Sequence, residues 1–357
     1  MHIVYFITAH GYGHAVRSAA IANRISPEIK ITFRTNIPSS FFHEELSRPF
    51  SCVPGEFDCG CIQSSSVTVD MEKTLSAYNA IAKKNSTLLQ KELSWCRENR
   101  ADCIVSDITP FAFEVARNLG IPSVAVSNFT WLDIYQEYAE YYPEYLPLLK
   151  QIRIQYSFAD LLLALEPSLQ MPYFRERKTV PVVGRRGSNV KEQVIKKYGI
   201  SPRKKLGLIY IGDFGMNGAD WERLSEFKDW EFIGLNPLSP GPSNYHIIDK
   251  KNFRYQDLTA SSDLVISKLG YGVVSECFLN GVPLLYLPRK HFAEYPILEK
   301  AVSDWGGGIC LTEEQFLSLS WKESLKCITT MDELPVLHSD GAEICASSIE
   351  RMLKDSV

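Results

Sequence analysis

The sequence predicts an α/β protein made of two Rossmann-like, doubly wound domains that face each other across a cleft. Short apolar runs alternate with longer helix-like segments along all 357 residues. Several apolar runs are continuous in Val, Ile and Leu, as expected for strands that helices cover on both faces. Such a succession of strands and helices is typical of parallel sheets. At about 150 residues per domain, the length accommodates two such domains.

Each element is placed by its apolar spacing and by the turn residues around it. In the first half, strands are expected at 2–8, 30–35, 103–107, 123–127, 160–165 and 180–184. In the second half, strands are expected at 206–212, 231–235, 264–267, 283–287 and 308–311. Helices are expected between them, for example at 15–24, 71–99, 111–119 and 273–280.

The boundary between the two domains is expected between residues 184 and 205. The basic segment GRRG at 184–187 precedes a helix and the turn PRKK, and a new buried strand begins at Leu206. The predicted division is therefore 1–184 for the first domain, 185–205 for a linker and 206–341 for the second domain. The last segment, 342–357, is expected to form a helix that either completes the second domain or crosses back to the first.

Composition excludes several classes of function. Lys and Arg total 38 and Asp and Glu total 42, a net charge of −4, which gives no electrostatic reason to expect a nucleic acid or an anionic membrane as partner. No apolar run reaches the ~18 residues of a membrane span, and the N-terminus lacks a secretory pattern. Nine unpatterned cysteines fit a reducing cytoplasm. Cys59 and Cys61 would need further ligands to hold a metal, with His43 the nearest candidate, so no metal or cofactor is expected.

The sharpest local pattern is SKLGYGVVSE at 267–276, where a strand ends, two glycines follow and a helix begins. Gly270 and Gly272 would let a phosphate approach the free N–H groups of the helix start, although an ordinary tight turn has the same glycines. Glu276 lies about one turn into the helix, where it could accept hydrogen bonds from a ribose. The polar run 289–294 follows the next strand, at the sheet edge where ligands bind. Together these features indicate a nucleotide diphosphate that carries a polar group.

Two further segments of the second half carry weaker signals. The turn at 210–215, which contains Gly212, is read equally well as a phosphate contact or as a loop that closes a strand. The segment Asn252–Tyr255 precedes a helix, and its main-chain groups could read a base.

The first half carries the segment TAHGYGHAVR at 8–17, which contains His10 and His14 after a strand and before a helix. Each histidine alone is as readily structural as catalytic. His14, near the helix start, could stay neutral and act as a general base. Asp107 ends a predicted strand and could orient the imidazole, or cap the helix that begins near Phe111.

These segments resemble the GT-B glycosyltransferases, and most closely the glycosyltransferase-like N-terminal region of plant L-arabinokinases and its stand-alone bacterial relatives. The resemblance rests on HGYGHAVR, VSDITPFAFEVARNLGIPSVAVSNFTWLDIYQEY, SKLGYGVVSE and GVPLLYLPRKHFAEYPILE. The glycine-rich segment alone is also similar to MurG-type N-acetylglucosaminyltransferases and plant UDP-glycosyltransferases. The resemblance does not extend to the kinase half of arabinokinases, so it implies no sugar kinase activity.

The resemblance implies that the second domain binds a sugar nucleotide, and that the first binds an acceptor and carries the base. His14 is then the base, and Asp107 orients it. The implied donor contacts are the diphosphate ligands Gly270, Gly272 and Ser275, the ribose ligand Glu276, the base-reading loop Phe253, Arg254 and Tyr255, the sugar ligand Glu294, and Gly212, Lys268 and Tyr271. The implied acceptor-side residues are His10, Gly13, Arg17 and Asn128.

The expected reaction is transfer of a sugar from a nucleotide-diphosphate sugar, with UDP as the expected nucleotide, to an unidentified acceptor. Retaining relatives with two glutamates spaced EX7E would need Glu at the position of Lys268, so inversion is expected, without a tightly bound metal. A UDP-sugar 2-epimerase and a non-catalytic nucleotide-sugar binding protein are the alternatives. The tyrosines of 135–145 are expected to pack on a helix rather than to stack on an acceptor.

Overall fold

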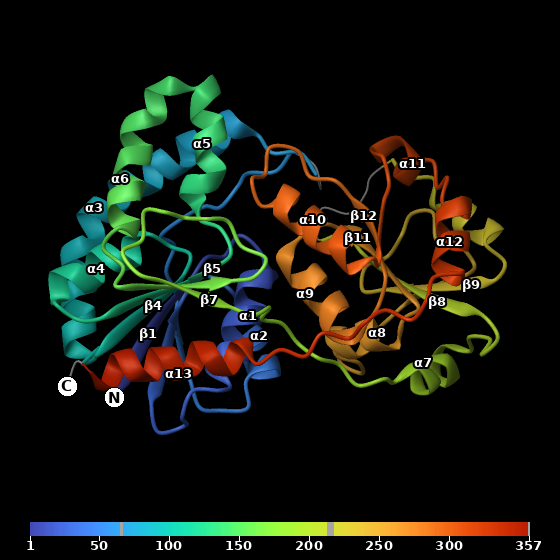
Figure 1. Ribbon diagram of the computed structural model, residues 1–357, viewed down its shortest axis with the longest axis horizontal. Helices are drawn as coiled ribbons and strands as arrows, with labels where there is room; N and C mark the ends of the chain where they lie inside the picture. The colour runs from blue at the N-terminus through green and yellow to red at the C-terminus, as the bar shows by residue number, and fades with distance from the viewer. Residues whose placement is uncertain (65–66, 213–217, 356–357) are drawn as a thin grey trace.

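The computed structural model describes residues 1–64, 67–212 and 218–355. It has two lobes, each a sheet with helices on both faces (Figure 1). The first lobe contains seven parallel strands in the order β3-β2-β1-β4-β5-β6-β7. Their bounds are β1 His2–Ile7, β2 Lys30–Arg34, β3 Ser51–Val53, β4 Cys103–Asp107, β5 Ser123–Ser127, β6 Leu161–Leu165 and β7 Arg177–Val180.

The second lobe repeats this topology with six parallel strands in the order β10-β9-β8-β11-β12-β13. Their bounds are β8 Lys205–Tyr210, β9 Trp230–Gly234, β10 Tyr245–Ile247, β11 Leu264–Lys268, β12 Leu284–Leu287 and β13 Gly308–Cys310. Both sheets thus have the doubly wound order in which the first strand lies between the second and the fourth. The predicted fold class, α/β with two Rossmann-like halves, is confirmed.

Helices connect the strands and cover both sheets. Those of the first lobe are α1 Tyr12–Ala22, α2 Ser39–Glu45, α3 Met71–Glu98, α4 Phe111–Leu119, α5 Trp131–Tyr141, the 3-10 helix η1 Pro143–Tyr145 and α6 Leu146–Tyr156. Those that follow are α7 Lys191–Tyr198, the 3-10 helix η2 Trp221–Glu226, α8 Tyr255–Ser261, α9 Tyr271–Asn280, α10 Tyr295–Trp305, α11 Glu313–Leu317, α12 Lys322–Thr329 and α13 Gly341–Lys354. In the described part of the chain, no helix combines the length and apolarity that a membrane crossing requires.

The predicted strands match the structure with one correction. The run 180–184 was expected as a strand, but β7 covers Arg177–Val180 and ends there. Pro181 follows directly and has no N–H for the next ladder bond, which explains why the strand stops before the apolar residues do. The three-residue edge strands β3 and β10 carry too short a pattern to be predicted.

The last helix, α13, follows the second sheet in sequence but lies along the first lobe (Figure 1). It packs against α1, β4 and β7, and its Cys345, Ile349 and Leu353 are fully buried. Burial of an apolar face of this kind stabilises a helix far more than its intrinsic propensity does. The limits of the two domains given above stay a prediction.

The two lobes meet where the first turns of α1 and α9 touch. Gly13 and Gly272 are the second residues of these helices, and a Cβ built on Gly272 would lie 3.5 Å from Gly13 Cα. Each helix follows the central strand of its sheet or that strand's neighbour, β1 in the first lobe and β11 in the second. The carboxyl ends of both sheets therefore face one shared region between the lobes.

Candidate functional site

His14 and Asp107 form a buried pair at the carboxyl edge of the first sheet. His14 lies in the first turn of α1, and Asp107 is the last residue of β4. His14 Nδ1 lies 2.8 Å from Asp107 Oδ1, and the carboxylate is fully buried while His14 is 8% exposed. An Nδ1–H that donates to Asp107 leaves the Nε2 lone pair able to accept a proton. The pair thus has the geometry of a base and its orienting group.

Asp107 has a second and stronger partner in Arg17, which lies one turn further along α1. Arg17 donates from Nε to Oδ2 and from Nη2 to Oδ1, both at 2.6 Å, and the Ser18 hydroxyl donates to Oδ2 at 3.1 Å. Burial alone would raise the pKa of the Asp107 carboxyl, but Arg17 and His14 hold it below its ordinary value. The carboxylate therefore stays ionised, and its charge is shared between the guanidinium and the imidazole.

Asn128 links this cluster to the second lobe. Its side-chain oxygen accepts a hydrogen bond from Arg17 Nη1 at 2.6 Å, and its amide nitrogen donates to Glu294 Oε1 at 2.7 Å. Glu294 directly precedes α10 and is 3% exposed. The structure thus brings Arg17 and Asn128, expected on the acceptor side, together with Glu294, expected on the donor side.

The N-terminus of α9 is open to a ligand. Gly270 is the N-cap residue, and among the described residues no side chain caps the helix and no atom lies within 4 Å of a Cβ built on Gly270. The same open space surrounds Gly11 and Gly13 at the start of α1. Free N–H groups and the helix dipole attract anions at such ends. Two helix N-termini in contact therefore offer backbone donors to a phosphate group from both lobes.

The side chains of Tyr271 and Ser275 point away from this open end. The Tyr271 hydroxyl accepts from Val183 N–H at 2.9 Å and lies 3.3 Å from the Glu166 carbonyl oxygen, to which it donates. The Ser275 hydroxyl donates to the Gly272 carbonyl at 2.9 Å. Both residues are buried, so the backbone rather than these side chains lines the opening of the first turn.

Glu276 is buried beside Arg185 of the connecting segment. Arg185 Nε donates to Glu276 Oε1 at 2.6 Å, and Arg185 Nη1 pairs with Glu45 of α2 at 2.5 Å. Burial raises the pKa of Glu276, and Arg185 opposes this effect. Glu276 Oε2 is buried and has no hydrogen-bond partner within the described residues. It is an acceptor that a hydroxyl of a bound molecule could satisfy.

The three residues of the expected base-reading loop diverge. The Phe253 side chain is 9% exposed and belongs to the apolar core. Arg254 precedes α8 and pairs with Asp257 at 2.8 Å, with a side chain that is 63% exposed. Of the three, only Tyr255 lies beside the Arg185–Glu276 pair, with its ring centroid 6.0 Å from the Arg185 guanidinium carbon. Base recognition by this loop stays a prediction.

Gly212 and Lys268 lie next to each other at the carboxyl ends of β8 and β11. A Cβ at Gly212 would be 3.6 Å from Lys268 Nζ, and Gly212 has φ +77°, a conformation that favours glycine. Residues 213–215 of the turn that the sequence singled out lie outside the described residues. A cation and a glycine with a positive φ thus lie near the start of α9.

His10 is fixed by the loop that carries the two neighbouring cysteines. The Cys61 N–H donates to His10 Nδ1 at 3.1 Å. Gly60 has φ +61°, and a Cβ there would overlap the His10 ring at 2.3 Å, so both the conformation and the close approach require glycine. Burial raises the pKa of the Cys61 and Cys59 thiols to about 12. Over the residues that the structure describes, no group of three or more potential ligands is placed to hold a metal ion.

The sequence did not indicate Asp58, which lines a cavity of about 200 Å³ together with Thr8, His10 and Thr109. The hydroxyls of Thr8 and Thr109 each donate to one oxygen of Asp58. Burial raises the pKa of Asp58, and these hydrogen bonds oppose the shift. Thr8 and Thr109 follow β1 and β4 closely, which was the available signal, whereas Asp58 lies in an irregular segment without a recognisable pattern.

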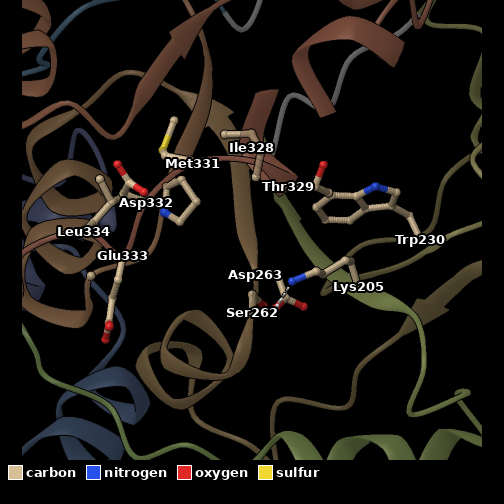
Figure 2. Close-up of a pocket in the computed structure, with 12 residues that line it drawn as sticks. Lys205, Trp230, Ser262, Asp263, Ile328, Thr329, Met331, Asp332, Glu333 and Leu334 are labelled. Carbon is tan, nitrogen blue, oxygen red and sulfur yellow. Dashed lines mark ion pairs between the residues drawn. The ribbon is translucent and has the colours of Figure 1, made fainter. Parts of the chain in front are cut away.

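A second cavity, of about 340 Å³, lies at the opposite edge of the second sheet (Figure 2). Lys205 and Trp230 begin β8 and β9, and Asp263 directly precedes β11. Lys205 Nζ lies 3.6 Å from Asp263 Oδ1, and both residues line this cavity. Ligands of open α/β sheets bind at the carboxyl ends of strands, so this cavity at the amino ends is not part of the candidate site.

Comparison with known proteins supports the fold. The chain is 29% identical to L-arabinokinase of Arabidopsis thaliana over 97% of its own length and 34% of that protein. It is 33% identical, over 22% of its length and 21% of the other protein, to the UDP-N-acetylglucosamine–N-acetylmuramyl-(pentapeptide) pyrophosphoryl-undecaprenol N-acetylglucosamine transferase of Clavibacter michiganensis subsp. michiganensis. The chain thus spans about a third or less of the curated relatives it matches. No protein-family model matches it.

Among solved structures, the chain is similar to the kitacinnamycin glycosyltransferase, with a TM-score of 0.64 at 15% identity, over 99% of this chain and 95% of that one. The overlay covers both lobes, because it extends over nearly the full length of each chain. The chain therefore has the two-lobed GT-B fold of glycosyltransferases, as the resemblance implied.

Proposed function

We propose that this chain is a glycosyltransferase that moves a sugar from a nucleotide-diphosphate sugar to an acceptor hydroxyl or amine. One observation carries the proposal: His14 of the buried His14–Asp107 pair directly follows Gly13, which contacts Gly272 at the open N-terminus of α9. A base and a diphosphate-binding helix end thus face the same region from opposite lobes. In this proposal, residues 1–184 bind the acceptor, 185–205 connect the lobes, and 206–341 bind the donor.

The donor is held by the second lobe. Backbone N–H groups at Gly270 and Gly272 bind the diphosphate, with Lys268 and Gly212 beside them. Glu276 Oε2 accepts a ribose hydroxyl, and Glu294 accepts hydroxyls of the sugar. UDP is the proposed nucleotide, because the Clavibacter relative is named for a UDP-sugar substrate.

The reaction proceeds by direct displacement with inversion. The acceptor oxygen or nitrogen attacks the anomeric carbon, the bond from that carbon to the diphosphate oxygen breaks, and the nucleotide diphosphate leaves with the electron pair. His14 Nε2 takes the acceptor proton, and Asp107 steadies the imidazolium. The helix end and Lys268 stabilise the charge of the leaving diphosphate without a tightly bound metal.

The polar cavity beside His10 is the proposed acceptor subsite. Thr8, Asp58 and Thr109 line it with hydroxyl and carboxylate groups. The nearby aromatic side chains are not available to an acceptor, because Trp131, Tyr135 and Tyr138 are fully buried against one another. A small hydroxylated acceptor therefore fits this subsite better than a large aromatic one.

Binding of nucleotide sugars tests the proposal. A ligand at about 100 times its Kd stabilises a protein by about 2.7 kcal/mol, which a thermal-shift assay detects. We expect a UDP-sugar to raise the Tm and to be consumed with release of UDP. A screen of UDP-, dTDP- and GDP-sugars in which none raises the Tm would contradict the proposal.

A UDP-sugar 2-epimerase is the second candidate, because such an enzyme needs carboxylates around the donor, and Glu294 lies against Asn128 while Asp58 lines the cavity beside His10. Incubation with UDP-N-acetylglucosamine and no acceptor separates the two activities. Release of UDP supports the transferase, whereas a new UDP-sugar without acceptor assigns the epimerase. Nucleotide binding with neither product would instead support a binding protein.

A further inference from the structure

Arg289 is a largely buried cation that makes no hydrogen bond to the described residues. It lies two residues beyond the end of β12, and its side chain is 8% exposed. Its guanidinium carbon lies 3.6 Å from the centre of the Phe292 ring. Its nearest carboxylate oxygen, Glu294 Oε2, is 3.9 Å from Nη1, which is too long for a hydrogen bond. Within the described residues, Arg289 has no closer polar partner.

Glu294 does not form a hydrogen-bonded ion pair with Arg289. Its other oxygen accepts a hydrogen bond from Asn128 at 2.7 Å, which fixes the carboxylate toward the first lobe. A guanidinium carries five N–H donors, and largely removing them from water without providing acceptors costs free energy. Consistent with this, burial lowers the pKa of Arg289, and Glu294 only partly opposes the effect. A bound acceptor group would remove the imbalance.

His10 adds a second donor beside Arg289. Its ring and the Arg289 guanidinium both lie against Phe292, the ring centroids of His10 and Phe292 being 6.5 Å apart. Burial and the charges of Arg289, His14 and Lys268 lower the pKa of His10, so the ring is neutral. Because Nδ1 accepts the Cys61 N–H, the single ring proton is on Nε2. His10 therefore presents an N–H, not a lone pair, on its other side.

We propose that Arg289, with His10 beside it, binds a carboxylate or phosphate of the substrate that is distinct from the nucleotide diphosphate. The inference rests on the proposed glycosyltransferase function, in which the start of α9 holds the diphosphate. The planar fork of an arginine fits a carboxylate or phosphate through two parallel hydrogen bonds. Two sources supply this chemistry: a uronosyl group on the donor, or an anionic group on the acceptor.

Matched pairs of neutral and anionic ligands test the proposal by calorimetry. In the donor arm, UDP-glucose is compared with UDP-glucuronate, which differs only in the oxidation state of C6. In the acceptor arm, glucose is compared with glucose 6-phosphate in the presence of UDP. We expect a preference of at least tenfold for the anionic ligand in one arm, and that arm identifies the source.

Two variants remove the same charge from neighbouring positions. Arg289→Gln should reduce the preference to less than twofold while UDP binds as before, and Lys290→Gln, at an exposed position, should leave it unchanged. Equal affinity of wild-type protein for both members of each pair overturns the proposal without any variant. Equal effects of the two substitutions overturn it as well. If UDP, dTDP and GDP all fail to bind, the proposed function is wrong. The affinities of glucose 6-phosphate and glucose, measured without a nucleotide, then show whether the anion site exists.

Discussion

At the carboxyl edge of the first sheet, the groups proposed for the reaction are side chains. At the carboxyl edge of the second sheet, several of the groups proposed to bind the donor are backbone N–H groups. In the first lobe, His14, Arg17 and Asp107 are buried and joined by short hydrogen bonds. In the second lobe, Gly270 leaves open space at an uncapped helix end. Both helices begin with a glycine and a tyrosine–glycine pair, so the two lobes differ in the next residue of the first turn, which is His14 in α1 and the apolar Val273 in α9.

The largest expected effect is the loss of reaction rate in a variant of the first lobe. His14→Ala removes the base, which typically contributes about 10²–10⁴-fold to a proton-transfer step. The rate of UDP release from a donor should fall by about that factor. The Kd for UDP should stay within twofold, because the proposed nucleotide contacts lie in the other lobe. His43→Ala, at an exposed histidine, is the control. Equal losses of rate and nucleotide affinity would contradict the division between the lobes.

Arg17→Met should cost stability rather than nucleotide affinity. It leaves the buried Asp107 carboxylate without its cation and Asn128 without its donor, and breaking a buried pair in this way costs about 3–5 kcal/mol. Arg24→Met removes an exposed pair with Glu343 and should cost less than about 1 kcal/mol. Chemical unfolding in urea measures both. Similar losses would show that the Asp107 cluster is not the structural centre of its lobe.

The same carboxylate should make stability depend on pH. Because the folded pKa of Asp107 is depressed, its contribution is complete above the unfolded pKa of about 3.9 and is lost as the pH falls through the folded value. The difference in Tm between wild type and Asp107→Asn should therefore be constant above about pH 5 and shrink at lower pH. A difference that grows on acidification would reverse the assigned sign.

The sequence could predict the strands, the helices and the pairing of His14 with Asp107, because these follow from local apolar patterns and from strand ends that share one sheet edge. It could not predict that Arg17 binds the same carboxylate, because this contact depends on how α1 packs against the ends of the strands. Nor could it predict that Arg289 lies beside His10, because that contact depends on how the two lobes meet. Tyr271 and Ser275 were assigned to the donor by resemblance. They are four residues apart and so share one face of α9, which packs inward.

A smaller effect sharpens the comparison on the donor side. Glu276→Gln removes the charged acceptor proposed for the ribose and should weaken UDP binding by about 1.5–3 kcal/mol. Glu45→Gln removes the other carboxylate partner of Arg185 and should leave the Kd nearly unchanged. The wild-type protein should discriminate against 2′-deoxy-UDP, and Glu276→Gln should not. A variant that keeps this discrimination would place the ribose elsewhere.

The smallest expected effect separates binding from stability at the open helix end. Gly270 has φ −152°, which any residue adopts, and open space for a Cβ. Gly270→Ala should therefore stabilise the fold by about 0.4–1 kcal/mol, because alanine restricts the unfolded chain. The added methyl group stands where a diphosphate would approach the backbone, so UDP affinity should fall by severalfold. Gly241→Ala, where a Cβ would make only an ordinary contact at 3.6 Å, should leave the affinity unchanged. A rise in Tm without any loss of affinity at Gly270 would mean that the nucleotide does not reach this turn, and the backbone role of the second lobe would then be wrong.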